Sequence, residues 1–481
     1  MNRVQRRIIT ILIVLIALLS VTTIIFLFVI KPNLAPPKLI FDESVNESEQ
    51  ISVENAFKKS EFKLTSDLKI SILEKTDLKD LQNFVVLSIK VPVTDFYDYR
   101  FDSISMKNIA DDSKVSLIDI KDLTVEQRLL ALDGNYYLDS FSSGAVFRTA
   151  YFSGSDSSDF AKAIENDFQI PGKNETLTLM QTGVTALARE MIYKLNSVGD
   201  PKYFSEQIGN FLSDADYTHT SNEVSFMNNC PTSSSMSFCS PMAMLEVLKS
   251  SGIDIVELTG NHNNDRGSDY NTETINLYHE LGWGTFGGGL NNAEAAKPFK
   301  INTKNSNIAM FGYNVPCDAI SGTDSAGANC YDYDDMVSDI AAAKANDEFV
   351  IIDFQYMECY SYPDGYIEFP ECDSPIVGQT ELFRSAINAG ADMVVGVQAH
   401  QPQTFEIYNG KPIFYGLGNL YFDQDEWPGT ERSLVLKHYF LNGKYVQTRI
   451  FATVYGSEMQ TKLMDNAEKL TFIERLLKSR P

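Results

Sequence analysis

The residues best suited to chemistry are polar clusters that follow short apolar runs in the second half of this 481-residue chain. The clearest cluster is Gly260-Asn261-His262. A glycine allows a tight turn, an asparagine oxygen can ligate a divalent cation, and an adjacent histidine can donate a proton to a leaving oxygen. The same residues could instead form a turn in which Asn261 caps the backbone and His262 is solvated. Comparable clusters contain Glu223, Gln355, Gln398 with His400, and Asn419.

These clusters must be positioned by the elements that precede them. After residue 172, apolar runs of strand length alternate with helical patterns, which predicts an α/β domain with a largely parallel sheet. Ligands of such sheets bind outside the carboxyl ends of the strands, so distant residues can converge on one crevice. The predicted strands are 176–181, 253–258, 307–312, 349–354, 393–397 and 412–415, followed by a hairpin over 434–455. The predicted helices are 186–195, 241–250, 273–281, 334–345, 380–389 and 466–478.

Charge and composition exclude several classes of function. The chain is 44% hydrophobic and 22% charged, which excludes a disordered, fibrous or polytopic membrane protein. Its formal net charge is −24, so a polyanion would be repelled and no nucleic-acid partner is expected. The first 31 residues hold four basic and no acidic residues. Removing those four positive charges from −24 leaves −28 on the remainder.

The amino-terminal segment predicts a membrane anchor. Residues 8–30 form an apolar run interrupted only by one serine and three threonines. As a helix this run would span about 35 Å, enough to cross a bilayer core of about 30 Å. A cleaved signal peptide is the alternative, but its apolar region is usually about 7–15 residues long. The three arginines before the run predict a cytoplasmic amino terminus, so we expect a single-pass cell-membrane protein with an extracytoplasmic body.

Four regions follow from these patterns. Residues 1–31 are the predicted cytoplasmic tail and anchor helix. Residues 32–55, rich in proline and glutamate, are the predicted linker. Residues 56–172 predict a small α+β domain without recognisable chemistry, and residues 173–481 form the α/β domain.

All six cysteines lie in the α/β domain. Outside the cytosol they can form disulfides, whereas six free buried thiols are the alternative. Sequence alone does not fix the connectivity of six cysteines. Their spacing favours three local pairs: Cys230–Cys239, Cys317–Cys330 and Cys359–Cys372.

Four longer motifs carry a family resemblance over about half of the chain. They are Asn222-Glu223, Thr-Gly-Asn-His-Asn-Asn-Asp-Arg-Gly at 259–267, Gly-Gly-Gly-Leu-Asn-Asn-Ala-Glu at 287–294, and the segment 394–424. With these motifs the chain resembles the bacterial capsule-synthesis, or poly-γ-glutamate-synthesis (CapA/PGA_cap), family, a branch of the calcineurin-like metallophosphoesterases. The resemblance implies a four-layer α/β/β/α sandwich with a two-metal cleft at the strand ends.

The resemblance assigns expected roles to five residues. It places Glu223, Asn261 and His400 at metal-ligand positions and His262 at the position of the proton donor. Arg189 follows the first motif at the family's spacing and is the second candidate catalytic residue.

Three further ligand positions of the family are substituted here. Val184 replaces a carboxylate, Gln355 replaces a histidine, and Gln398 replaces the first histidine of a His-x-His motif. Glutamine is a weak neutral ligand and valine offers none. Two-metal phosphoryl chemistry needs several anionic or imidazole ligands around metals about 3.5–4 Å apart. We therefore expect at most one weakly held divalent cation (Mn, Fe, Zn or Mg), or none.

Several other polar residues have two interpretations. Asp216, Asp265 and Asp423 are candidates to replace the missing carboxylate. His219 could approach the cleft, although a surface position is the favoured interpretation. We expect structural roles for His279 and His438.

Three functions fit these observations. The first is a membrane-anchored CapA-type protein that assists synthesis or export of a surface polymer. The second is an active metal-dependent hydrolase with a remodelled single-metal site. The third is a surface binding or scaffold module. No lysine- or arginine-rich run is present to grip an anionic polymer, so membrane-bound synthesis or export proteins are the expected partners, ahead of tight binding to the polymer itself.

Overall fold

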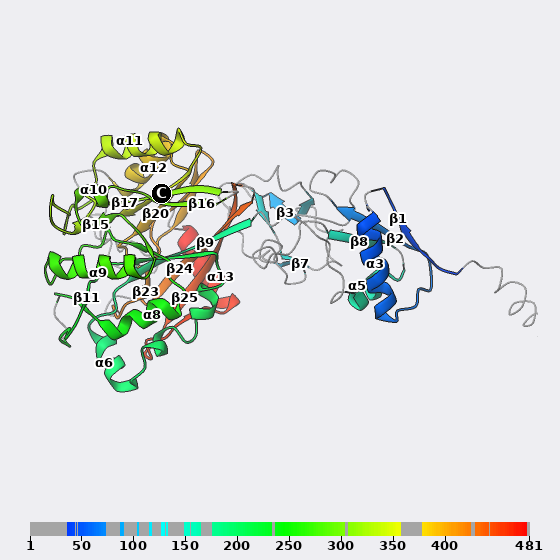
Figure 1. Cartoon of the computed structure of the whole chain (residues 1–481), viewed down its shortest axis with the longest axis horizontal. Helices are drawn as coiled ribbons and strands as arrows, with labels where there is room; N and C mark the ends of the chain where they lie inside the picture. Colours follow the sequence, from blue (N-terminus) through cyan, green and yellow to red (C-terminus); the bar gives the residue numbers. More distant parts are fainter. Residues whose placement is uncertain are drawn as a thin grey trace, which may run out of the picture. The chain divides into compact units, whose positions relative to one another are not determined.

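The computed structural model describes two compact units, each considered separately below (Figure 1). The first comprises residues 1–84 and 146–172, and the second comprises residues 85–145 and 173–481. The described residues are 36–73 without 44 and 46, short strands between 87 and 153, 155–164, and 176–478 without 233–235, 304–305, 357–377, 425–428 and 442. No helix in these ranges is long and apolar enough to span a bilayer. The predicted anchor at 8–30 lies outside them and stays a prediction.

The first unit is a small sheet covered by two helices. Strand β2 pairs in parallel with β1 and antiparallel with β8. Apolar side chains of α3 and α5, among them Val53 and Phe160, are buried with Leu68 and Ile70 of β2. Strand β1 and most of α3 lie within residues 32–55, so this stretch contributes folded elements as well as a connection. The elements are β1 (Leu39–Phe41), α3 (Glu47–Ser60), β2 (Leu68–Leu73), β8 (Thr149–Ser153) and α5 (Ser157–Ile164).

Five short strands are described in the stretch of sequence that separates the two parts of the first unit. Strand β3 pairs antiparallel with β5 and β6, and β4 pairs in parallel with β7. Their bounds are β3 (Leu87–Lys90), β4 (Ser103–Ile104), β5 (Val115–Leu117), β6 (Gln127–Leu129) and β7 (Ala131–Leu132). The domain boundaries at 55 and 172 stay predictions.

The second unit contains an eight-stranded mixed sheet. Its order is β14-β13-β10-β9-β24-β25-β26, with β23 also paired to β9. The strands up to β9 and β23 are parallel, and β24–β26 form the antiparallel part. The bounds are β9 (Thr176–Thr185), β10 (Tyr217–Asn222), β13 (Ile255–Glu257), β14 (Gly284–Phe286), β23 (Asn419–Tyr421), β24 (Arg432–Leu441), β25 (Lys444–Tyr455) and β26 (Thr461–Leu463).

A six-stranded sheet forms the other half of this unit. Its order is β16-β17-β19-β20-β22-β21, with four parallel central strands and an antiparallel strand at each edge. The bounds are β16 (Phe299–Thr303), β17 (Ser306–Asn314), β19 (Phe349–Gln355), β20 (Met393–Val397), β21 (Phe405–Tyr408) and β22 (Lys411–Phe414).

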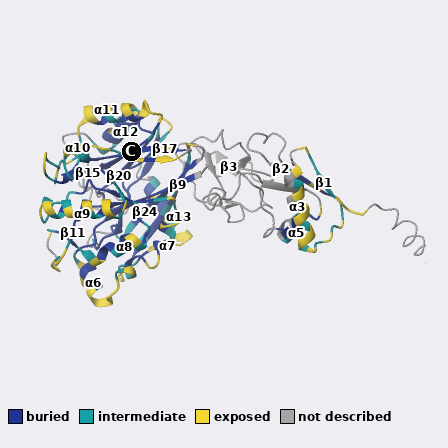
Figure 2. Ribbon diagram, in the orientation of Figure 1, coloured by how far each residue is buried: buried dark blue, intermediate teal, exposed yellow. Residues whose placement is uncertain are grey.

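Alternating side chains build three cores from these two sheets. Successive strand residues point to opposite faces, so Leu179 packs between the sheets while Met180 packs against the outer helices. On the six-stranded sheet, Met310 faces the inter-sheet core and Phe311 faces outward. The strands are buried and the helices carry the exposed faces (Figure 2). The result is a mixed α/β fold of two facing sheets with helices outside.

The helices divide between the two outer faces, except for the last. Helices α6 (Glu190–Val198), α8 (Leu245–Ser250) and α9 (Ser268–Glu280) cover the eight-stranded sheet, and α11 (Tyr333–Lys344) and α12 (Gln379–Ala389) cover the other. Helix α13 (Asn466–Lys478) contributes Phe472 and Leu476 to the inter-sheet core. The smaller elements are η6 (Pro201–Phe204), α7 (Gly209–Leu212), β11 (Phe226–Met227), β12 (Ser240–Pro241), η7 (Met242–Met244), α10 (Asn292–Ala295), β15 (Gly288–Gly289) and β18 (Gly327–Ala328).

Candidate functional site

The site begins with three side-chain amides that meet across the two sheets. Gln355 is the last residue of β19, Gln398 follows β20, and Asn261 lies in the loop after β13. Nε2 of Gln355 donates to Oε1 of Gln398 at 2.6 Å and to Oδ1 of Asn261 at 3.2 Å. The predicted convergence of these strand ends is therefore confirmed for three of the expected positions.

The backbone of Gln398 adopts an uncommon conformation. Its φ is 78°, in the region that favours glycine. Such a conformation costs about 1–3 kcal/mol and persists only where the surroundings fix it. Gln398 is 4% exposed, and its hydrogen bond to Gln355 is one of the contacts that hold it. Strained residues of this kind cluster at functional sites.

His262 is oriented by an acidic partner three residues later. Its Nδ1 lies 2.7 Å from Oδ2 of Asp265, and its ring packs 4.2 Å from that of Phe238. Burial lowers the pKa of His262, but the hydrogen bond to Asp265 and the charge of Glu223 outweigh it, so the pKa lies above its ordinary value. Asp265 therefore positions the imidazole instead of replacing the missing carboxylate ligand.

Arg189 forms a buried ion pair with Asp423. Its Nε donates to Oδ1 of Asp423 at 2.9 Å, and the backbone N–H of Glu190 donates to the other carboxylate oxygen at 2.6 Å. The guanidinium also lies over the rings of Phe238 and Phe422, at 5.6 and 5.0 Å. Burial raises the pKa of Asp423, and Arg189 offsets this in part. This buried pair joins the start of α6 to the chain after β23.

Glu223 and His400 complete the group of expected ligands. Glu223 follows β10 and is buried. Gly260 packs against it so closely that a Cβ added at Gly260 would lie 2.3 Å from the Cβ of Glu223. His400 is also buried, with Nδ1 2.8 Å from Oδ1 of Asn419. Both residues influence the pKa of His262, Glu223 raising it and His400 lowering it, so the three belong to one electrostatic environment.

The donors at this site do not fit a pair of metal ions. Val184 is buried in β9 and offers no ligand atom. The amide oxygens of Asn261 and Gln398 already accept hydrogen bonds from Gln355. Within the described ranges, no three His, Cys, Asp or Glu side chains gather as a metal-binding group. Glu223, Asn261 and His400 are the other expected ligand positions, and each keeps a side-chain oxygen or nitrogen donor.

Asp216 lies far from these donors along the strands. Its carboxylate accepts from N and Oγ1 of Thr178 at 2.7 and 2.8 Å, near the amino ends of β9 and β10. The site lies at the carboxyl ends, so the proposed replacement role of Asp216 is wrong.

Two disulfide-closed loops hold the segment 259–267. The predicted pairs Cys230–Cys239 and Cys317–Cys330 are confirmed, with Cα–Cα distances of 5.8 and 4.7 Å. No described cysteine is free, and the pair Cys359–Cys372 lies outside the described residues.

The first of these loops contacts the histidine's partner. The backbone N–H of Phe238 donates to Oδ2 of Asp265 at 2.7 Å, and Arg266 donates to the carbonyl of Ser237 at 2.7 Å. The ring of Phe238 also packs against that of His262 in a tilted arrangement. The Cys230–Cys239 loop thus fixes one side of the His262 segment.

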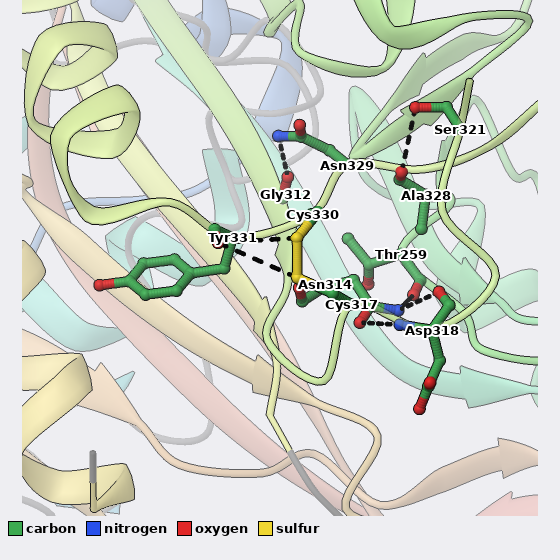
Figure 3. The surroundings of a disulfide bond; sticks show 10 residues. All are labelled: Thr259, Gly312, Asn314, Cys317, Asp318, Ser321, Ala328, Asn329, Cys330 and Tyr331. Atoms are coloured by element: carbon green, nitrogen blue, oxygen red, sulfur yellow. Dashed lines mark hydrogen bonds between the residues drawn. A yellow bond between two sulfur atoms is a disulfide. The ribbon is translucent and has the colours of Figure 1, made fainter. Parts of the chain in front are cut away.

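The second loop fixes the other side (Figure 3). Asn314 donates through Nδ2 to the carbonyl oxygens of Thr259, at 2.8 Å, and Asp318, at 3.1 Å. Asn264 donates to the carbonyl oxygens of Ala319 and Ala326, at 3.2 and 3.0 Å. The Cys317–Cys330 loop is therefore tied directly to the segment that carries Asn261 and His262.

A second polar cluster lies deeper, between the sheets. His438 of β24 bonds through Nε2 to Oε1 of Gln181 and through Nδ1 to Oγ1 of Thr448, at 2.9 and 2.7 Å. Gln181 donates to Asp353, whose carboxylate lies 3.5 Å from Nε2 of His219. Burial raises the pKa of Asp353 and lowers those of His219 and His438 to about 3. The favoured surface position of His219 is wrong, because this residue is fully buried in a central strand.

The geometry defines a two-sheet α/β protein with a polar site at the carboxyl ends of its central strands. The chain belongs to the bacterial capsule synthesis protein PGA_cap family, whose profile matches residues 178–424, about half of the chain. The capsule biosynthesis protein CapA of Bacillus anthracis is 24% identical over 278 residues, which cover 56% of this chain and 64% of that protein. The PGA biosynthesis protein CapA of Bacillus subtilis is 27% identical over 206 residues, 41% of this chain and 50% of that protein. This chain thus spans about half to just under two thirds of these relatives.

Solved structures with similar folds are more distant. The NAD nucleotidase of Haemophilus influenzae is 11% identical, with a TM-score of 0.32 and coverage of 63% of each chain. The protein TT1561 of Thermus thermophilus is 10% identical, with a TM-score of 0.31 and coverage of 57% of this chain and 98% of that chain.

Proposed function

We propose that this chain is a membrane-anchored, extracytoplasmic CapA-type protein that assists the synthesis or export of poly-γ-glutamate or a related surface polymer. It acts beside membrane-bound synthesis or export proteins and does not hydrolyse phosphoesters efficiently. Its α/β/β/α architecture keeps the form of a metallophosphoesterase while the metal site is degenerate. The family membership and the names of the two Bacillus relatives support the involvement in polymer synthesis.

One observation carries the non-hydrolytic part of the proposal. Gln355 donates one amide group to Gln398 and Asn261, and Val184 lines the position of a carboxylate. Phosphoryl transfer with two metals requires anionic or imidazole ligands that hold both ions. A hydrogen-bonded amide network satisfies its own polar groups and leaves no such ligand set.

Two measurements test the proposal. Deleting the gene should lower cell-surface polymer, and the full-length chain should restore it. The purified full-length chain in detergent should contain substoichiometric Mn, Fe, Zn and Mg and show no phosphoesterase turnover above that of a Glu223→Ala/His400→Ala double variant. Stoichiometric metal, with turnover that the double variant loses, would contradict the degenerate site.

An active hydrolase with a remodelled single-metal site is the second candidate. It is favoured by His262, whose pKa is raised beside Asp265 and Glu223, as a proton donor requires. The side chain of His262 is 13% exposed and contacts Asp265 and Phe238, so the test uses His262→Gln, which keeps a polar side chain of similar size, together with its thermal unfolding. Turnover that this variant abolishes without a change in thermal stability would establish the second candidate over the first.

A further inference from the structure

A pocket lined by three lysines and three acidic residues lies at the amino ends of the six-stranded sheet, opposite the amide cluster. Its volume is about 340 Å³, at the lower end of the usual range of roughly 300–1,000 Å³ for ligand sites. Its walls come from segments far apart in the sequence: the end of α11, the starts of β19 and β22, and the β24–β25 turn. Phe349 and Tyr445, whose rings stack at 5.4 Å, provide an apolar floor. Lysines 344, 411 and 444 supply the basic groups.

Two of these lysines are arranged around one buried carboxylate. Asp392 accepts from Nζ of Lys344 at 2.6 Å, from Nζ of Lys411, and from the backbone N–H of Val350 at 2.9 Å. The Asp392 side chain is 7% exposed, whereas both lysine side chains are 40% exposed. Both ammonium groups are therefore held by Asp392, and Nζ of Lys344 also donates to the carbonyl of Glu348 at 3.1 Å, on side chains that are partly exposed. Lys344 and Lys411 carry two positive charges and Asp392 one negative charge, so this group has a net charge of one positive unit.

The remaining charges around the pocket nearly balance. Glu348, which is buried, pairs with Lys300 of β16 at 2.6 Å. Lys444 and Asp347 are both exposed at the rim, one basic and one acidic. The excess on Lys344 and Lys411 thus remains, on a chain whose net charge is −24. At physiological salt the Debye length is about 8 Å, so an anion in the pocket responds mainly to these near charges.

We propose that this pocket binds a carboxylate-bearing segment of an anionic polymer, with Lys344, Lys411 and Lys444 facing the carboxylates and Phe349 and Tyr445 facing the aliphatic part. A flexible polycarboxylate with methylene spacers combines these two features, and the geometry of Asp392 between two ammonium groups already shows their fit to a carboxylate. The proposal rests on the proposed function, because a γ-linked glutamate chain is a polymer of this chemistry. It assigns polymer contact to the end of the sheet away from the amide cluster.

Fluorescence anisotropy of a labelled γ-linked glutamate decamer tests the pocket, using the full-length chain in detergent. The wild type should bind, and binding should weaken with added salt. Lys444→Gln should weaken it by about two- to fivefold, as expected for the loss of one exposed ionic contact. Asp347→Asn should strengthen it by a similar factor. Lys462→Gln, which makes the same charge change on an exposed position of β26, should leave it unchanged.

Any of three results would contradict polymer binding in this pocket. They are no binding by the wild type, equal weakening by Lys444→Gln and Lys462→Gln, and equal binding of an uncharged γ-linked glutamine decamer. If the wild type restores surface polymer to a deletion strain but does not bind the decamer, the pocket fails and the proposed function stands. If binding depends on Lys444 but deletion of the gene leaves surface polymer unchanged, the proposed function fails and the pocket stands.

Discussion

The side-chain amide of Gln355 donates to Oε1 of Gln398 at 2.6 Å, joining two neighbouring strand ends of the six-stranded sheet. The same nitrogen reaches Asn261 of the facing sheet at 3.2 Å. Hydrogen bonds therefore link the sheets where the family pattern expects metal ligands. A buried polar group that is hydrogen-bonded in this way has no need of a cation to compensate its desolvation.

Restoring the expected ligands should restore metal binding. A Val184→Asp/Gln355→His/Gln398→His variant introduces one carboxylate and two imidazoles next to Glu223 and His400. We expect Mn or Zn affinity to rise by at least the roughly 10–100-fold that supporting groups contribute at metal sites. Calorimetric titration and metal analysis of the folded variant measure this. Gln207→His, which adds a surface histidine, should not increase affinity, and an equal gain there would refute the assignment.

Removing the Cys317–Cys330 disulfide should destabilise the protein and loosen the His262 segment. The cysteines are 13 positions apart, so Cys317→Ser/Cys330→Ser should lower the free energy of unfolding by about 2–3 kcal/mol. Denaturant unfolding measures the loss, and amide hydrogen exchange of residues 259–267 should accelerate. Ser321→Ala removes only the hydroxyl contacts to Asn292 and to the carbonyl of Ala328, leaves the disulfide in place and serves as the control. Unchanged exchange in 259–267 would show that the loop does not support this segment.

The Arg189–Asp423 pair should contribute strongly to stability. Asp423→Asn removes a fully buried carboxylate from a guanidinium that is 10% exposed, and breaking such a pair costs about 3–5 kcal/mol. The exposed pair Lys202–Glu246 is the matched comparison, and Glu246→Gln should cost less than about 1 kcal/mol. Equal losses of unfolding free energy in the two variants would contradict a structural role for Asp423.

His438 should make the folded state sensitive to acid. Its native pKa of about 3 means that the unfolded chain, with a histidine pKa near 6.5, binds more protons between these values. Stability contributed by neutral His438 is therefore complete above pH 6.5 and falls as pH drops toward 3, by up to about 1.4 kcal/mol per pH unit.

The variant His438→Gln tests this dependence. It retains hydrogen-bonding groups toward Gln181 and Thr448 but does not titrate. The stability difference between wild type and variant should shrink as pH falls from 6.5 to 4.5. A constant difference would mean that the pKa of His438 is the same in the folded and the unfolded protein. His219 and Asp353 face each other at 3.5 Å and are present in both proteins, and the charge of His219 also lowers the pKa of His438, so the comparison reports the coupled titration of the two histidines.

Periodicity was sufficient to predict most of the second unit. Buried strands such as β19 and β20 are continuous apolar runs, and Asn466–Lys478 shows a helical pattern, so all three were placed close to their actual bounds. Strand β10 was harder, because it reads Tyr-Thr-His-Thr-Ser-Asn and yet lies between β9 and β13 with almost no exposure. Two of its polar side chains find partners on these strands, Thr220 with Thr185 and Ser221 with Glu257. A polar composition therefore gave the wrong environment for His219.

The candidate site was predictable as a set of positions but not as a network. Strand-end placement indicated that Gln355, Gln398 and Asn261 would meet, whereas their shared hydrogen bonds depend on side-chain orientation. The ring contact between Phe238 and His262 joins residues 24 positions apart, and no local sequence pattern marks it. The sequence does not predict the pocket at the amino ends of the six-stranded sheet, for a similar reason. Lys344, Lys411 and Lys444 are too widely spaced to form a charge run, and only the fold brings them together.

The two disulfide-closed loops couple assembly of the His262 segment to oxidative maturation. Before the thiols are oxidised, neither the loop that carries Phe238 nor the loop that carries Ala319 and Ala326 is closed covalently, although both contact the segment 259–267. Thiols stay reduced in the cytosol and are oxidised after export. With the proposed extracytoplasmic location, a newly made chain would therefore carry both loops unclosed until after export, and disulfide formation would complete the surroundings of the His262 segment.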